Sequence, residues 1–310
     1  MSHPPHGAVP SFEDDVRLAR AALAAGDVGH ATHHVAGAVG SGADRPECAA
    51  LIDAFCAAAA PDPLAAVPAT GLWFGLGALR AALLVRAGRG GEAVPLLLAC
   101  LAAAPTAPFV PWLARWLDDP DLVAAVAPGD VARELVACTR HEPLGAALHA
   151  HARRLHDAHP DHDLLAFAAV KLARMCWRIG DAVAIARAAI ARGPMPMTSI
   201  GLAGALREDG DLEGAIAAFT EALRHDPDNV GIQLDLGDLN LQLGHLAAAS
   251  AAYQAALVLE PENTWAPPSI LFVAWRADGT QASADALRAY AAACPDNRRA
   301  QDLLRDLAAS

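Results

Sequence analysis

The chain has 310 residues, of which 54% are hydrophobic and only 5% aromatic, and its formal net charge is −12. Nucleic acids and anionic membranes attract basic surfaces, so this acidic balance argues against both as nonspecific partners. The alanine-rich composition with few aromatic side chains favours closely packed helices over β-sheet, and it predicts an all-α protein.

The N-terminal segment, residues 1–11, is expected to form a disordered tail because it is rich in proline and polar residues. It lacks the basic start and apolar run of a secretory signal. Six widely spaced cysteines without a C-x-x-C pair fit reduced core residues, so we expect a cytoplasmic protein. The uncharged stretch Pro63 to Leu79 is interrupted by Pro68 and glycines, which predicts a buried helix pair and no membrane span. The frequent alanine, arginine and proline suggest a GC-rich bacterial source.

Residues 12–128 are predicted to form a degenerate helical region. Turn residues at Gly26-Asp27 and at Gly88 separate segments with helical apolar spacing. The prolines between residues 105 and 128 flank one expected short helix, Trp112 to Leu117. We interpret this part as the junction between two halves of the chain.

Helix pairs continue after the junction, and residues 129–297 are predicted to form regular repeats. Gly180-Asp181 is the expected turn between the two helices of one pair. The helices expected before residue 195 are 131–138, 144–158, 164–179 and 182–192.

Residues 196–229 and 230–263 are two copies of one pattern with a period of 34 residues. Each copy contains a turn glycine, then a small alanine, an aromatic residue and a terminating proline. These residues are Gly210, Ala215, Phe219 and Pro227 in the first copy, and Gly244, Ala249, Tyr253 and Pro261 in the second. The pattern resembles the tetratricopeptide repeat (TPR), a helix-turn-helix unit of this length.

Each residue type suits its place in such a unit. A glycine after the first helix adopts positive φ at little cost, and Asp211 can then cap the second helix. Ala215 lets the two helices approach closely, while Phe219 fills the space between them. Residues 264–297 are a degenerate third copy, because Gly279 comes one place late, and residues 298–310 are the expected capping helix.

The resemblance implies a right-handed α-α superhelix whose first helices line a concave groove for a partner protein or peptide. The groove residues it implies are Phe167, Val170, Arg174, Trp177, Arg178, Met197, Ile200, Gly204, Arg207, Leu234, Asp238, Gln242, Trp265, Phe272, Trp275 and Arg276. Aromatic and arginine side chains there would suit a peptide with apolar anchors and a carboxylate. The alternative is that these aromatic residues pack between repeats or against a capping helix. The clamp with which some family members hold chaperone tails is absent, since its positions include Ile200, Gly204 and Leu234.

Two groups of histidines are candidate metal sites. The larger group is His149, His151, His156, His159 and His162. Pro160 breaks the helix between possible ligands, so a solvated helix end is the alternative to a zinc or nickel site. In the smaller group, His30 and His34 have helical spacing with no third ligand implied, and a surface turn is expected.

The sequence carries no nucleophile elbow, phosphate-binding glycine loop or H-E-x-x-H motif, so neither catalysis nor a cofactor is expected. We therefore expect a non-enzymatic scaffold or adaptor that binds a partner protein or peptide in its groove. One alternative is homo-oligomeric self-assembly through the segment around Trp112 and Trp116. Another is a ligand- or metal-responsive regulator that uses the histidines between residues 149 and 162.

Overall fold

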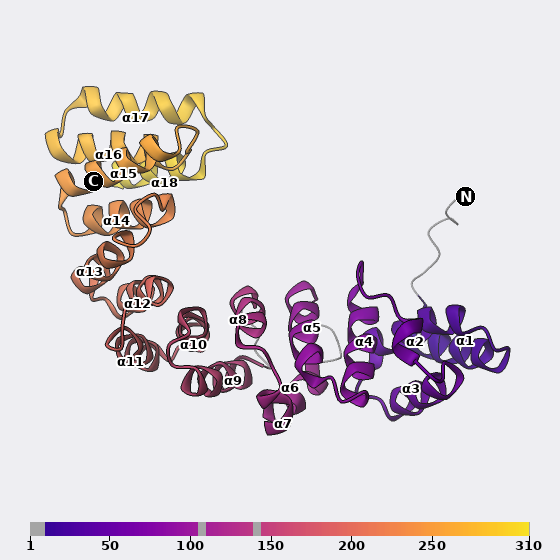
Figure 1. The fold of residues 1–310 in the computed structure, drawn as a ribbon. Coiled ribbons are helices and arrows are strands. Elements are labelled where there is room, and N and C mark those ends of the chain that lie inside the picture. The colour runs from indigo at the N-terminus through magenta and orange to yellow at the C-terminus, as the bar shows by residue number, and fades with distance from the viewer. Residues whose placement is uncertain (1–9, 105–109, 139–143, 310) are drawn as a thin grey trace. The chain divides into compact units, whose positions relative to one another are not determined.

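The computed structural model describes residues 10–104, 110–138 and 144–309. Every regular element in these ranges is a helix, and they contain no strand (Figure 1). This confirms the all-α helical-repeat fold. The expected disordered tail lies outside the described residues, apart from its last two positions.

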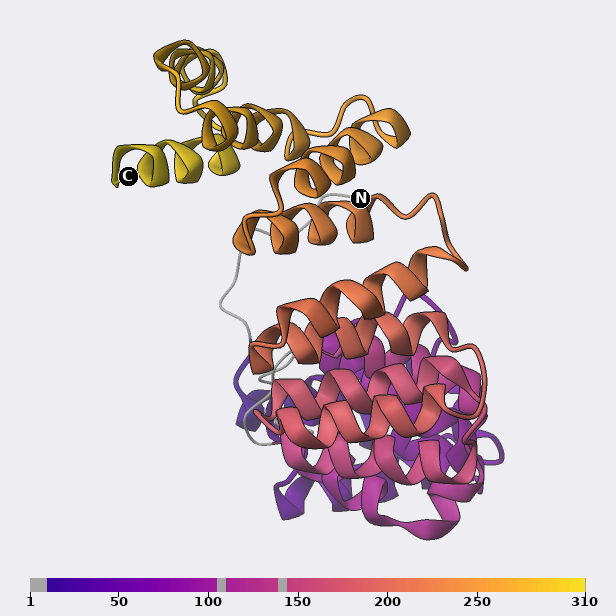
Figure 2. The same ribbon diagram turned by 90° about the vertical axis from the view of Figure 1, so that its left-hand side faces the viewer.

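The chain divides into two compact units, unit 1 (Met1–Cys176) and unit 2 (Trp177–Ser310). Within each unit, neighbouring helices lie side by side (Figures 1 and 2). The described helices of unit 1 are α1 (Phe12–Ala24), α2 (Val28–Gly42), α3 (Pro46–Ala58), the 3₁₀ helix η1 (Pro63–Ala66), α4 (Phe74–Arg86), α5 (Gly90–Ala103), α6 (Val110–Asp118), α7 (Pro120–Ala124), α8 (Pro128–Ala137), α9 (Gly145–Ala158) and α10 (Asp163–Met175). Here α1 packs against α2, α4 against α5, and α9 against α10.

Three expectations for unit 1 were wrong in detail. The stretch from Pro63 to Leu79 is no buried helix pair: it holds η1, an exposed loop and the start of α4. Two helices, α6 and α7, lie in the proline-rich segment where one was expected, and this segment is part of unit 1 and does not separate the two units. His30 and His34 lie in α2 and in no surface turn, and His34 is buried.

Unit 2 contains consecutive helix pairs. Its helices are α11 (Ile179–Ile190), α12 (Pro196–Asp209), α13 (Leu212–Leu223), α14 (Val230–Gln242), α15 (Leu246–Leu259), α16 (Ala266–Asp278), α17 (Gln281–Ala293) and α18 (Arg298–Ala309). The pairs α12/α13, α14/α15 and α16/α17 follow the 34-residue pattern, and α18 packs against α16 and α17.

The turns of the two clear repeats form as the sequence predicts. Gly210 has φ of 89° and Gly244 has φ of 75°, the left-handed conformation that glycine adopts without a Cβ clash. The Oδ1 atom of Asp211 accepts a hydrogen bond of 2.9 Å from the backbone N–H of Gly214. The predicted cap of the second helix is therefore confirmed.

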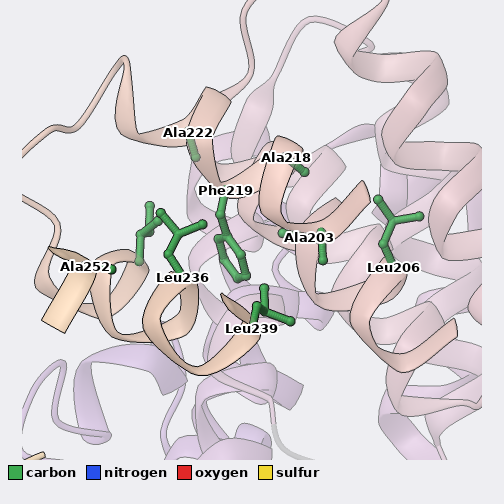
Figure 3. Packing of buried hydrophobic residues seen from close by; sticks show 10 residues of the cluster. Ala203, Leu206, Ala218, Phe219, Ala222, Leu236, Leu239 and Ala252 are labelled. Atoms are coloured by element: carbon green, nitrogen blue, oxygen red, sulfur yellow. The ribbon is translucent and has the colours of Figure 1, made fainter. Parts of the chain in front are cut away.

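The signature residues of both repeats form the core. Phe219 is 2% exposed and lies against Leu236 and Leu239 of the next repeat (Figure 3). Tyr253 is fully buried, and a Cβ at Gly237 would lie 2.4 Å from its Cε1 atom. Position 237 of α14 is therefore glycine because a side chain there would collide with the Tyr253 ring.

The turn predicted at Gly180-Asp181 is wrong. α10 ends at Met175 and α11 already begins at Ile179, so Gly180 is a helical residue. The left-handed conformation belongs to Trp177 instead, with φ of 58°.

None of the helices in the described ranges is long and apolar enough to cross a membrane. The six cysteines are free thiols, and Cys48, Cys100 and Cys138 are buried. Burial raises the pKa of each of these three thiols to about 11.

Candidate functional site

A groove in unit 2 lies between α14, α16 and α18, and its volume is about 490 Å³. Four of the residues that were expected to bind a partner line this groove: Asp238 and Gln242 of α14, and Phe272 and Arg276 of α16. The remaining walls come from α18. Its lining residues there are Arg299, Leu303, Asp306 and Ala309.

Arg299 lines this groove and ties α18 to the repeats. Its Nη2 atom donates to Oδ1 of Asp238 at 2.5 Å and to the hydroxyl of Tyr253 at 3.2 Å. Its Nε atom donates to Oγ of Ser269 at 3.0 Å, and its guanidinium carbon lies 4.7 Å from the centre of the Trp265 ring. One side chain of α18 therefore contacts α14, α15 and α16 at once.

The polar network around Asp238 is partly shielded from water. The side chains of Arg299 and Asp238 are 16% and 26% exposed. The hydroxyl of Tyr253 donates to Oδ1 of Asp238 at 2.5 Å. Burial, followed by the neighbouring carboxylate of Asp238, raises the pKa of Tyr253, so this hydroxyl stays protonated.

The predicted groove aromatics of unit 2 differ in exposure. Phe272 is 4% exposed and its ring centre lies 5.4 Å from that of the half-buried Trp275. Trp265 is 39% exposed and faces Arg299, while Leu234 packs against the core of the last repeats. Phe272 and Leu234 are thus mainly packing residues, with Phe272 also lining the groove.

The predicted arginines of unit 2 also differ from one another. Arg178 pairs with Asp181 at 2.8 Å, and Arg207 pairs with Asp235 at 2.8 Å. Arg276 is exposed and makes no ion pair with any described residue. It is the predicted arginine whose charge faces the groove without an internal partner.

The remaining predicted positions are not part of this groove. Phe167 and Arg174 are half-buried residues of α10, in unit 1. Trp177 is 75% exposed and precedes α11. The sequence-predicted set is therefore divided between the two units.

The larger histidine group was expected either to bind metal or to lie at a solvated helix end, and only part of it is solvated. On α9, His149, His151 and His156 are all buried, whereas His159 is exposed. Burial, and then the charge of Arg154, lower the pKa of His151 to about 4. The described residues contain no group of three or more metal-ligating side chains that could hold an ion.

The apolar segment that suggested self-assembly is largely covered. Trp112 is only 8% exposed, and its ring centre lies 6.1 Å from that of the half-buried Trp116. Both rings line a cleft of about 240 Å³ together with Ile52 and Val85. The expected apolar patch is thus mostly a cleft within unit 1.

Sequence reasoning missed Arg299. The capping helix was expected from its period, but nothing in the spacing says that Arg299 reaches Asp238, 61 residues earlier. A weak signal exists, because Arg299 lies 34 residues after Trp265 and so takes the same place in the repeat.

Comparison with known families agrees with the repeat pattern. Two family models, each described as a tetratricopeptide repeat, match residues 178–230 and 206–266. No characterised protein in a search of curated sequences is similar to the chain.

Solved structures of low sequence identity align with parts of the chain. A crystal structure of MamA has 15% identity and a TM-score of 0.42, covering 55% of this chain and 95% of that one. One of PilW, described as a widely conserved type IV pilus biogenesis factor, has 14% identity and a TM-score of 0.47, covering 74% and 98%. The structure of Naa15/Naa10 bound to HypK-THB has 14% identity and a TM-score of 0.42, covering 94% and 41%.

Proposed function

Since residues 178–266 match the tetratricopeptide repeat family, we propose that the protein is a non-enzymatic scaffold or adaptor that binds a segment of a partner protein in the groove of α14, α16 and α18. Modules of this family commonly mediate protein-protein interactions. The proposal includes a cytoplasmic location, which rests on the spacing of the cysteines.

The observation that carries the proposal is the position of Arg276, which has no ion-pair partner among the described residues, beside an apolar wall. The wall consists of Phe272 and Leu303, and Gln242 is exposed on the opposite helix. An arginine binds a carboxylate through two parallel hydrogen bonds, which gives direction as well as affinity. The proposed ligand is therefore an extended segment with an acidic side chain or C-terminal carboxylate next to an apolar residue.

Arg299 limits how the segment can bind. The guanidinium of Arg299 already pairs with Asp238 and lies over the Trp265 ring. Asp238 and Trp265 would therefore stabilise the groove and would contact the bound segment little. Contacts to the partner would then come from Gln242, Arg276 and the groove residues of α18 that follow Arg299. The other predicted positions of unit 2, Arg178, Arg207 and Trp275, would extend the contact surface.

The test is site-specific photo-crosslinking combined with charge reversal. A photoreactive residue replaces Gln242, and captured proteins are identified by mass spectrometry from native cytoplasm. Arg276→Glu is expected to abolish the crosslink, since it places a carboxylate where the ligand carboxylate would bind. Arg288→Glu, an exposed change on α17 outside the groove, is the matched control and should keep it. A crosslink that survives Arg276→Glu as well as the control would refute the groove.

A further inference from the structure

Two histidines of α2 direct the same ring atom at each other. His30 and His34 are one helical turn apart, and their Nε2 atoms are 3.2 Å from one another. His30 is exposed, while His34 is 9% exposed. The pair thus lies at the surface with one ring anchored in the interior and the other open to solvent.

A buried carboxylate fixes the orientation of the inner ring. Asp15 of α1 is 6% exposed, and its Oδ1 atom is 2.8 Å from Nδ1 of His34. Because an ionised carboxylate only accepts, Nδ1 of His34 carries the proton, and its Nε2 lone pair is directed at His30. A Cβ at Gly37 would lie 2.3 Å from the Asp15 carboxylate, so a glycine of α2 makes room for this contact.

The arrangement matches a metal ligand with its supporting residue. A histidine that binds zinc commonly donates its other ring N–H to a carboxylate, which holds the ring in place and raises its basicity. Zinc binds imidazole nitrogen at about 2.0–2.1 Å, so two nitrogens in a tetrahedral shell are about 3.3–3.4 Å apart. The separation of 3.2 Å between the two Nε2 atoms is close to this value.

The geometry points to a zinc-binding site formed by Nε2 of His30 and Nε2 of His34, with Asp15 supporting His34. Without metal, a hydrogen bond joins the two rings, and one proton lies between them. On binding, the ion takes the place of this proton: His30 gives its Nε2 proton to water and takes up one proton from water at Nδ1. No net charge change of the rings is required.

The site is open and exchangeable. The described residues supply no third protein ligand at this place, so water completes the coordination shell. Imidazole favours zinc, nickel and copper over magnesium or calcium, which prefer oxygen ligands. The site differs from structural zinc sites, which have four protein ligands. It is also distinct from the groove described above, because its residues belong to unit 1 and the groove residues to unit 2.

Calorimetric titration of the full chain with Zn²⁺ at pH 7.5 tests the inference. The chain has 13 histidines, so the readout is the tightest event, expected at one equivalent. His30→Ala should remove this event, and Asp15→Asn should weaken it by about 10–100-fold, the usual effect of losing a supporting carboxylate. His33→Ala changes the neighbouring exposed histidine of α2 and is the matched control, which should bind as the wild type does.

A second measurement guards against loss of fold in the Asp15 variant. Zn²⁺ should shift the ring signals of His30 and His34 in NMR spectra of the wild-type protein before those of any other histidine. Equal titration curves for wild type, His30→Ala and His33→Ala would overturn the inference. So would first shifts at other histidines, which would show adventitious binding only.

Discussion

Replacement of Arg299 by methionine should weaken the contact of α18 with the last repeats. Methionine keeps much of the apolar stem but removes the hydrogen bonds to Asp238, Tyr253 and Ser269. Hydrogen bonds that involve a charged group contribute about 1.5–3 kcal/mol. Because water can reach the partly exposed Asp238 after the change, we expect a loss of about 2 kcal/mol in the stability of the α18 contact.

Hydrogen exchange measures this loss directly. A loss of about 2 kcal/mol should reduce the protection of the α18 amides about 30-fold, while α12 and α13 keep theirs. Repeat proteins unfold in parts, so local protection is a better readout than one global transition. Arg298→Met alters the adjacent exposed arginine and should change protection little. If both variants behave alike, Arg299 does not hold α18 and the description of the network is wrong.

Three further predictions test the core and the buried histidine. Phe219→Ala should cost about 3–5 kcal/mol in urea unfolding, because it opens a cavity between two repeats; a loss below about 1 kcal/mol would contradict this packing. Gly237→Ala should cost about 1–3 kcal/mol by overpacking against Tyr253, and Tyr253→Ala should relieve that strain in the double variant. The pKa of His151 is about 4 in the fold against 6.5 in the unfolded chain, so the unfolded state takes up the proton first as the pH falls. Stability should be complete above pH 6.5 and fall by up to about 3 kcal/mol towards pH 4, and His151→Leu should flatten this decline in pH-dependent unfolding.

The regular part of the fold follows from short-range chemistry, which a sequence displays. Gly210 and Asp211 are neighbours whose roles depend on the local backbone, so both were predicted correctly. The same reasoning failed at Gly180, because a glycine followed by aspartate is equally acceptable in the first turn of a helix. Local sequence cannot distinguish these two cases without the position of the preceding helix end.

The candidate site depends on long-range contacts and was predicted less well. Four groove residues were identified from their place in the repeat, but the contact of Arg299 with Asp238 arises only when α18 folds back on α14 and α16. The pairing of His34 with Asp15 was missed for the same reason, since it joins two helices through the space left by Gly37. Charges that meet across helices have no periodic signature.

Trp177 shows where this chain departs from the most stable solution. Positions 210, 244 and 279 follow the first helices of their repeats with left-handed glycine, whereas Trp177 takes the same backbone region at a cost of about 1–2 kcal/mol. A consensus sequence of the repeats would have glycine at position 177, and this change is expected to increase stability. A bulky side chain in so unfavourable a conformation is a departure that folding alone does not ask for. An idealised version of this protein would therefore replace Trp177 with glycine, and comparing the two chains would measure what the exposed indole contributes besides stability.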